Sequence, residues 1–289
     1  MWHDLRLHED PSWVAECLKN KTLVCVTDGS YMKEKAPNLC SAGWVMACKQ
    51  SRRHICGTLV ERSESADSYR GEMLGMLAIR LFLLAVEEYY GVITSGNDVC
   101  CDNKGALYTF AKKSKRVPAG KSNTDILRVL RTVNSRMKSN FVQHHVKGHQ
   151  DEYIKFSSLS WEAKMNCFCD KIAKKAIQQH LSAIVTGDPA PLDSNNCRSL
   201  PLEAARVYVN GSKQTSDVGK GLRWNIGRKQ AREFYKEQDI LPPKVFDAVD
   251  WDGLELALKG KPQMYKLWYG KQLSLIHISE PTRLRRISY

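Results

Sequence analysis

Apolar and polar positions along the chain first form strand-like runs and then alternate between helix and strand. Three β-type runs at 22–28, 41–49 and 54–62 are separated by polar turns and predict a three-strand meander. A long helix follows at 65–90, with Ser and Asp as candidate caps and Gly91 as its end. The meander is therefore followed by a helix long enough to cover a sheet.

The next 95 or so residues alternate strands with helices. The predicted strands are 97–103 and 140–148, and the predicted helices are 104–113, 121–139 and 159–185. Strands followed by alternating helices and strands predict an α/β sheet with helices packed on it.

Composition changes near residue 183 divide the chain. The segment "TGDPAPLDSNNCRS" is rich in Pro, Asp, Asn and Ser, which indicates a linker. Beyond it, "ARVYVNGSK" predicts a strand and "NIGRKQAREFYKEQ" a helix in a small α/β or mainly helical region. The predicted parts are a lead-in 1–20, an α/β domain 21–182, a linker 183–199, a basic C-terminal region 200–272 and a tail 273–289.

The tail, "LSLIHISEPTRLRRISY", resembles the translated reverse complement of a transposase-library sequencing adapter. We therefore expect that these residues do not belong to the natural protein and that the natural protein continues past Gln272. Without the three Arg and one Glu of the tail, the net charge of +13 becomes 13 − 2 = +11.

This excess of positive charge favours an anionic partner, with nucleic acid first, although a basic protein without such a partner is the alternative. Ten cysteines without a CxxC pair argue against a structural zinc site and for a reducing location, in the cytoplasm or nucleus. No apolar run reaches the ~20 residues of a membrane helix, so we expect no membrane partner.

Four acidic residues occupy positions that suit one site. Asp28 and Asp102 end strands, Glu72 lies in an apolar helix and Asp170 lies in the last helix of the domain. Each has an ordinary explanation as a turn, a cap or a solvated helix position. Together they suggest a cation site, because buried carboxylates repel one another unless a cation neutralises them, and oxygen ligands without cysteine suit Mg²⁺.

The order of these motifs resembles the type 1 ribonuclease H family across roughly residues 20–182. The resemblance lies in "DGS" at Asp28, "RGEMLGMLA" around Glu72, "CCDN" at Asp102, "HVKGHQDE" with His149, and "NCFCDKIAKKA" with Asp170. The amino-acid sequence of these motifs is most similar to that of the domain that follows reverse transcriptase in retroelements. It departs from compact members in the longer stretch between His149 and Asp170 and in lacking an evident basic protrusion.

The resemblance implies a five-stranded mixed sheet flanked by helices and an endoribonuclease that cleaves the RNA strand of RNA–DNA hybrids. It implies that Asp28, Glu72, Asp102 and Asp170 hold two Mg²⁺ ions, with Mn²⁺ as an alternative, for two-metal-ion hydrolysis. His149 would move protons or help product release, or would be a surface-loop residue. A reverse transcriptase upstream in the same polyprotein is an implied partner.

Candidate contacts to the hybrid flank two of the acids. Gly29 lets a phosphate or ribose approach closely, Ser30 can bond a sugar hydroxyl, and Asn103 can reach a base edge or 2′-OH. Lysines are candidate phosphate contacts as a class, namely Lys33, Lys35, Lys104, Lys112, Lys113 and Lys115. In the C-terminal region, aromatic residues among basic ones either form a small core, which we favour, or stack on single strands: Trp224, Phe234, Tyr235, Trp251 and Trp268.

Three other functions share parts of this pattern. The first is a ribonuclease H-like module that binds nucleic acid without cutting it. The second is an integrase or transposase core, which typically has Asp, Asp, Glu in that order, whereas here Glu72 comes second. The third is a structural piece of a retroelement polyprotein. Convergence of the four carboxylates would favour the enzyme.

Overall fold

The computed structural model describes residues 5, 10–112, 117, 122–186, 200–203, 206–209, 211–249 and 251. The predicted tail, Lys113, Lys115, Trp268 and the linker from residue 187 onward lie outside these residues. The chain divides into two compact units, Met1–Arg223 and Trp224–Tyr289.

The first unit is built on a five-stranded mixed sheet in the order β3-β2-β1-β4-β5. Strands β1 and β2 and strands β2 and β3 pair antiparallel, as a meander does, whereas β4 runs parallel to both β1 and β5. The predicted mixed α/β sheet is therefore confirmed. The strands are β1 (Leu23–Tyr31), β2 (Leu39–Cys48), β3 (His54–Arg62), β4 (Ser95–Cys101) and β5 (Asn140–His145).

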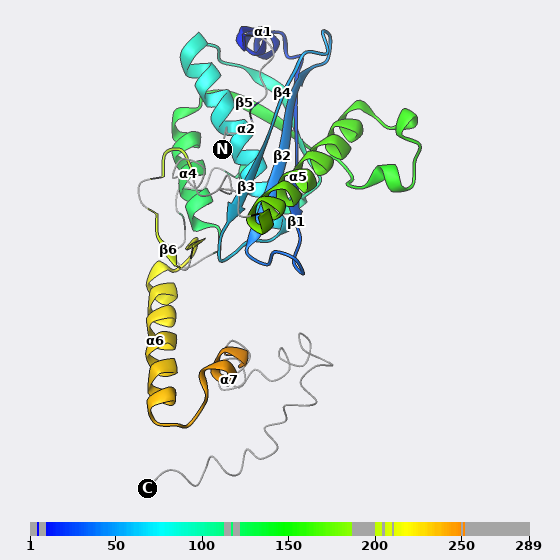
Figure 1. The fold of residues 1–289 in the computed structure, drawn as a ribbon. Coiled ribbons are helices and arrows are strands. Elements are labelled where there is room, and N and C mark those ends of the chain that lie inside the picture. Colours follow the sequence, from blue (N-terminus) through cyan, green and yellow to red (C-terminus); the bar gives the residue numbers. More distant parts are fainter. Residues whose placement is uncertain are drawn as a thin grey trace. The chain divides into compact units, whose positions relative to one another are not determined.

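Helices cover both faces of this sheet (Figure 1). Helix α5 packs on one face, whereas α1, α2, α3 and α4 contribute to the core on the other face. Helix α2 begins after Asp67, whose side chain accepts a hydrogen bond from Arg70 N, and ends at Gly91 in the left-handed conformation. The helices are α1 (Ser12–Asn20), α2 (Ser68–Tyr90), α3 (Lys104–Ala111), α4 (Thr124–Arg136) and α5 (Trp161–Thr186).

Helix α2 approaches the sheet closely where glycines face each other. A Cβ on Gly71 would lie 2.6 Å from the backbone oxygen of Ser41, and a Cβ on Gly29 would lie 2.7 Å from the backbone of Gly71. Only glycine fits such backbone-to-backbone contact. The consequence is that the next residue of the helix, Glu72, is held against the end of β1.

Residues 200–223 belong to the first unit, whereas composition placed a boundary in the linker 183–199. The predicted strand 205–213 is a short hairpin, β6 (Tyr208–Val209) and β7 (Ser212–Lys213), and a bridge joins Ser63 to Lys213. Glu64 accepts hydrogen bonds from the backbone nitrogens of residues 215 and 216. Tertiary hydrogen bonds thus attach this segment to the end of β3.

Helix α6 (Val218–Glu237) begins seven residues before the predicted helix 225–238, and α7 (Pro243–Ala248) follows it. In the second unit, Phe246 is buried against Trp251, with ring centroids 4.4 Å apart, and Tyr235 lies 6.0 Å away. Tyr235 and Trp251 therefore form part of a small aromatic cluster, as the core interpretation predicts. For Trp224 and Phe234 that interpretation is wrong, because both side chains are exposed.

None of the described helices combines the length and apolar character needed to cross a membrane. Nine cysteines are described, and all are free thiols.

Candidate active site

The register of the parallel strands brings two of the predicted acids together. Thr27 of β1 pairs with Cys101 of β4, so that Asp28 and Asp102 are the next residues of neighbouring parallel strands. The carboxyl ends of parallel strands are where open α/β sheets form their binding crevices. Asp28 is buried, and Asp102 is half-buried.

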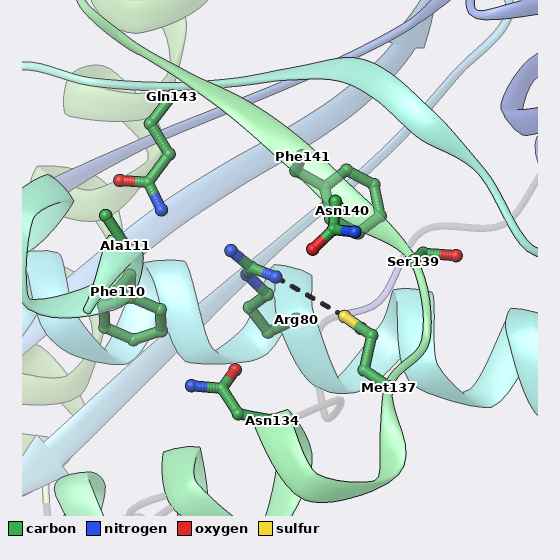
Figure 2. Close-up of a pocket in the computed structure, with 9 residues that line it drawn as sticks. All are labelled: Arg80, Phe110, Ala111, Asn134, Met137, Ser139, Asn140, Phe141 and Gln143. Carbon is green, nitrogen blue, oxygen red and sulfur yellow. Dashed lines mark hydrogen bonds between the residues drawn. The ribbon is translucent and has the colours of Figure 1, made fainter. Parts of the chain in front are cut away.

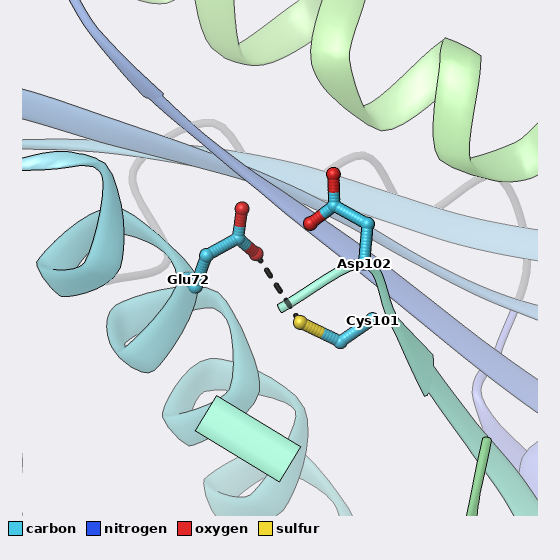
Figure 3. A group of neighbouring side chains, drawn as sticks. All are labelled: Glu72, Cys101 and Asp102. Carbon is cyan, nitrogen blue, oxygen red and sulfur yellow. Dashed lines mark hydrogen bonds between the residues drawn. The ribbon is translucent and has the colours of Figure 1, made fainter. Parts of the chain in front are cut away.

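Glu72 reaches the same point from helix α2 and is 2% exposed. Its Oε1 accepts a hydrogen bond of 2.8 Å from the backbone nitrogen of Gly29, and its Oε2 accepts one of 3.3 Å from Cys101 Sγ. Ligand atoms of Glu72, Cys101 and Asp102 all lie within 4.8 Å of one another (Figure 3). The carboxylate is thus fixed in orientation by two different strands.

Burial raises the pKa of all three carboxyls, and repulsion by neighbouring acids adds to this for Asp28 and Glu72. Burial, then the charge of Asp102, raises the pKa of Asp28 to about 7. Burial, then the charges of Asp28 and Asp102, raises the pKa of Glu72 well above its ordinary value. Burial also raises the pKa of Asp102. Without a cation, this cluster therefore retains protons that isolated carboxyls would lose.

Cys101 is a member of this cluster that sequence reasoning did not select. Burial and the charge of Glu72 raise the pKa of its thiol, so at neutral pH the thiol is protonated and acts as a hydrogen-bond donor to Glu72. The strand run "VCC" signalled only a buried strand. Because side chains alternate between the two faces of a strand, Cys100 packs on the α5 side and Cys101 on the α2 side. This alternation is the sequence feature that could have placed Cys101 on the same side of the sheet as Glu72.

The "KGH" loop lies against Asp102. A Cβ on Gly148 would overlap the Oδ2 atom of Asp102, and the Nε2 atom of His145 contacts the backbone oxygen of Asp102 at 2.9 Å. The His149 side chain is 53% exposed and lies 3.6 Å from Glu152, and its charge lowers the pKa of Asp102. The structure thus places His149 near the cluster and open to solvent.

Asp170 is held less tightly than the other acids. It lies on α5, its side chain is 21% exposed, and its Oδ2 is 2.7 Å from Lys174 Nζ. Its charge contributes to raising the pKa of Asp28, which places it in electrostatic contact with the cluster. Helix α5 is positioned there by Cys169, which is buried and hydrogen-bonds Val26.

The predicted substrate contacts have different environments. The nitrogen of Gly29 is engaged with Glu72, and Ser30 is buried. The side chain of Asn103 accepts a hydrogen bond from Ala106 N and so caps α3. Lys104 is exposed at the first turn of α3. Their roles toward nucleic acid stay predictions.

A buried ionic network next to the cluster was also missed by sequence reasoning. Arg70, two residues before Glu72, is fully buried and bonds Glu61, Asn123 and Asp125. Lys213 of β7 is buried as well, with its Nζ 2.7 Å from Asp125 and 2.9 Å from Glu203. The sequence does not predict this network, because its members are far apart in the chain and no spacing motif links them.

No family model matches the chain, and no curated protein matches it either. Among solved structures it is similar to the protease–reverse transcriptase of prototype foamy virus, at 17% identity and a TM-score of 0.39, over 53% of this chain and 20% of that one. It is also similar to the N-terminal RNase H domain of Rv2228c from Mycobacterium tuberculosis, at 14% identity and a TM-score of 0.34, over 57% of this chain and 97% of that one. LC11-RNase H1, solved in complex with an RNA/DNA hybrid, is 11% identical with a TM-score of 0.37, over 54% of this chain and 99% of that one.

Proposed function

We propose that the chain is a metal-dependent endoribonuclease that cleaves the RNA strand of RNA–DNA hybrids. The observation that supports this is the meeting of three carboxyls from β1, α2 and β4 at one buried edge, each with a raised pKa. Burying several acids close together costs folding free energy. A cation bound between them would offset this cost, which explains why the fold places them there.

The residues fit a divalent cation. Asp28, Glu72, Asp102 and Asp170 offer carboxylate oxygens, which hard ions such as Mg²⁺ prefer, with Mn²⁺ as an alternative. When bound, two such ions would supply an activated water and stabilise the charge on the leaving oxygen. The thiol of Cys101 is a soft and protonated group, so it orients Glu72 and does not serve as a ligand.

The remaining chemistry rests on groups of the chain itself. Gly29 N and Cys101 Sγ hold the Glu72 carboxylate in one orientation, which pre-organises it before substrate binds. The exposed His149 can exchange a proton with solvent or product next to Asp102. Lys174 is close enough to Asp170 to hold that carboxylate when no other cation does so.

Cleavage of a labelled RNA–DNA hybrid with and without Mg²⁺ tests the proposal. We expect the RNA strand to be cut only with Mg²⁺, and Asp102→Asn to lower the rate by about 10²–10³-fold or more. Asp98→Asn is the matched control, because Asp98 lies on the same strand but pairs with Lys49 at the surface. Equal rates for the wild type and Asp102→Asn would contradict the site assignment.

A second candidate is a ribonuclease H-like module that binds the hybrid without cutting it. The observation that favours it is the 2.7 Å ion pair of Lys174 with Asp170, which neutralises one acid internally. Binding of the hybrid without Mg²⁺-dependent cleavage, retained in Asp102→Asn, would select it. From the motif wording we also propose a retroelement origin, with a reverse transcriptase upstream in the same polyprotein and an intracellular site of action.

A further inference from the structure

A cavity of about 220 Å³ lies on the α2 side of the sheet, away from the carboxylate cluster. We call it the Arg80 cavity; its lining includes Arg80, Phe110, Asn134, Met137, Asn140 and Phe141. Figure 2 shows the guanidinium group of Arg80 in the middle of these side chains, which come from α2, α3, the C-terminal end of α4 with the residue after it, and β5. Arg80 is eight residues beyond Glu72, or about 12 Å along the helix.

Arg80 is 7% exposed, yet its charge has no anionic partner among the residues that the structure describes. Its Nε atom has no hydrogen-bond partner there. Its Nη1 atom donates to Met137 Sδ at 3.4 Å, and a thioether sulfur is a weak acceptor. Burial lowers the pKa of Arg80, and the thiol of Cys25 has a smaller effect in the opposite direction.

A buried charge in this condition is costly, because a guanidinium group stays protonated and loses its hydration shell without replacement. The ring of Phe141, 5.2 Å from the guanidinium carbon, offers a cation–π contact, which compensates only part of that loss. The fold leaves an open cavity at this point, although two other buried basic side chains of the same unit, Arg70 and Lys213, are paired with carboxylates. The Arg80 guanidinium thus lacks a strong acceptor among the residues that the structure describes.

Nearby acidic groups do not fill this role. Glu87, two turns further along α2, is buried, but both of its oxygens accept backbone hydrogen bonds, at 2.7 Å from Lys138 N and 3.0 Å from Ser139 N. The side chain of Ser139 accepts a bond from Thr94 N. Asn134 and Asn140 add amide groups to the lining. The polar groups left to meet a ligand are therefore the guanidinium group and neutral amides.

We propose that the Arg80 cavity binds a small free oxyanion, through a phosphate or carboxylate group held by the Arg80 guanidinium. The planar guanidinium donates two parallel hydrogen bonds to such groups. Phe110 and Phe141 form an apolar wall for the remainder of a small organic anion, and the volume limits the occupant to a compact molecule. The site is separate from the proposed cleavage reaction and does not depend on it.

Equilibrium dialysis of the full chain with radiolabelled inorganic phosphate, at fixed ionic strength in chloride, tests the proposal. We expect saturable binding of one phosphate per chain, competition by acetate, and at least tenfold weaker binding in Arg80→Met. Arg131→Met is the matched control, because Arg131 is an exposed arginine on α4 and its loss changes the net charge equally. Phosphate should also raise the melting temperature of the wild type and of Arg131→Met, but not that of Arg80→Met.

Three results would overturn the proposal. The first is equal phosphate binding by the wild type and Arg80→Met. The second is no saturable binding of phosphate or acetate by a folded wild-type chain, which would mean that water alone fills the cavity. The third is displacement of phosphate by an RNA–DNA hybrid in the wild type and in Arg131→Met, which would assign the guanidinium to the nucleic-acid backbone instead of a free anion. If Arg80→Met does not fold, Arg80→Lys replaces it, because lysine keeps the charge but loses the two-bond geometry.

Discussion

Removing the charge of Asp28 is expected to stabilise the metal-free protein while it abolishes the proposed cleavage. The pKa of Asp28 is raised from 3.8 to about 7, and each pH unit corresponds to about 1.4 kcal/mol. Ionising Asp28 in the folded, metal-free chain therefore costs at most about 4 kcal/mol. Asp28→Asn keeps the shape of the side chain and removes this cost, so we expect it to be more stable by about 1–4 kcal/mol above pH 7.

The pH dependence follows from the same shift. A carboxyl whose pKa is higher in the folded state binds its proton more tightly there, so its contribution to stability is complete below about pH 4 and is lost as the pH rises to about 7. In EDTA the wild type should lose stability across this window relative to Asp28→Asn. Mg²⁺ should restore the stability of the wild type above pH 7 and have less effect on the variant.

Urea unfolding followed by circular dichroism, between pH 4.5 and 8 with EDTA or Mg²⁺, measures these differences. Asp98→Asn is the control of opposite sign, because hydrogen bonds to Lys49 and His144 lower the pKa of Asp98 and its charge is favourable at neutral pH. Finding Asp28→Asn less stable than the wild type at pH 8 in EDTA would refute the account of the cluster as mutually repelling acids.

Two further substitutions separate function from stability. Gly148→Ala would place a Cβ against Asp102 Oδ2, a movable atom, so we expect less than about 1 kcal/mol of destabilisation but a large loss of Mg²⁺-dependent cleavage, measured by urea unfolding and the hybrid assay. Lys213→Met would leave Glu203 without its 2.9 Å partner and weaken the neutralisation of Asp125. We expect Lys213→Met to lower the free energy of unfolding by about 3–5 kcal/mol, measured by urea unfolding. If only the β6–β7 hairpin detaches, limited proteolysis should cleave it faster than in the wild type.

The sequence predicted those features of the fold that depend on local pattern. Apolar runs located all five strands of the main sheet, and Asp67 and Gly91 bounded α2 as caps. The pattern alone did not set the parallel register that puts Asp28 beside Asp102; the family resemblance implied only that these acids share a metal site. Composition also suggested a separate region after residue 200, whereas residues up to Arg223 belong to the first unit. The sequence could not show this, because a buried lysine such as Lys213 looks the same as a surface lysine until its partners are known.

The features that were missed share one physical cause. Cys101, Arg70 and Arg80 were assigned to strand or helix, but each acts through a tertiary contact with a residue at least 29 positions away. In the sequence, Arg80 is a single charged residue within an apolar run. Periodicity shows that such a side chain lies on a helix, and only the packed neighbours show whether its charge is satisfied.

Helix α2 buries four ionisable side chains, and their different environments distinguish structural from functional positions. Arg70 is neutralised by carboxylates, and Glu87 is satisfied by the backbone at 138–139. Glu72 faces other acids, and Arg80 faces a cavity without an anion. Buried charges in folded proteins are normally paired with an opposite charge. Glu72 and Arg80 have no such partner among the described residues, and we propose a cation at the first and an anion at the second. The two ligands should stabilise the chain independently, because about 12 Å of helix separates their sites.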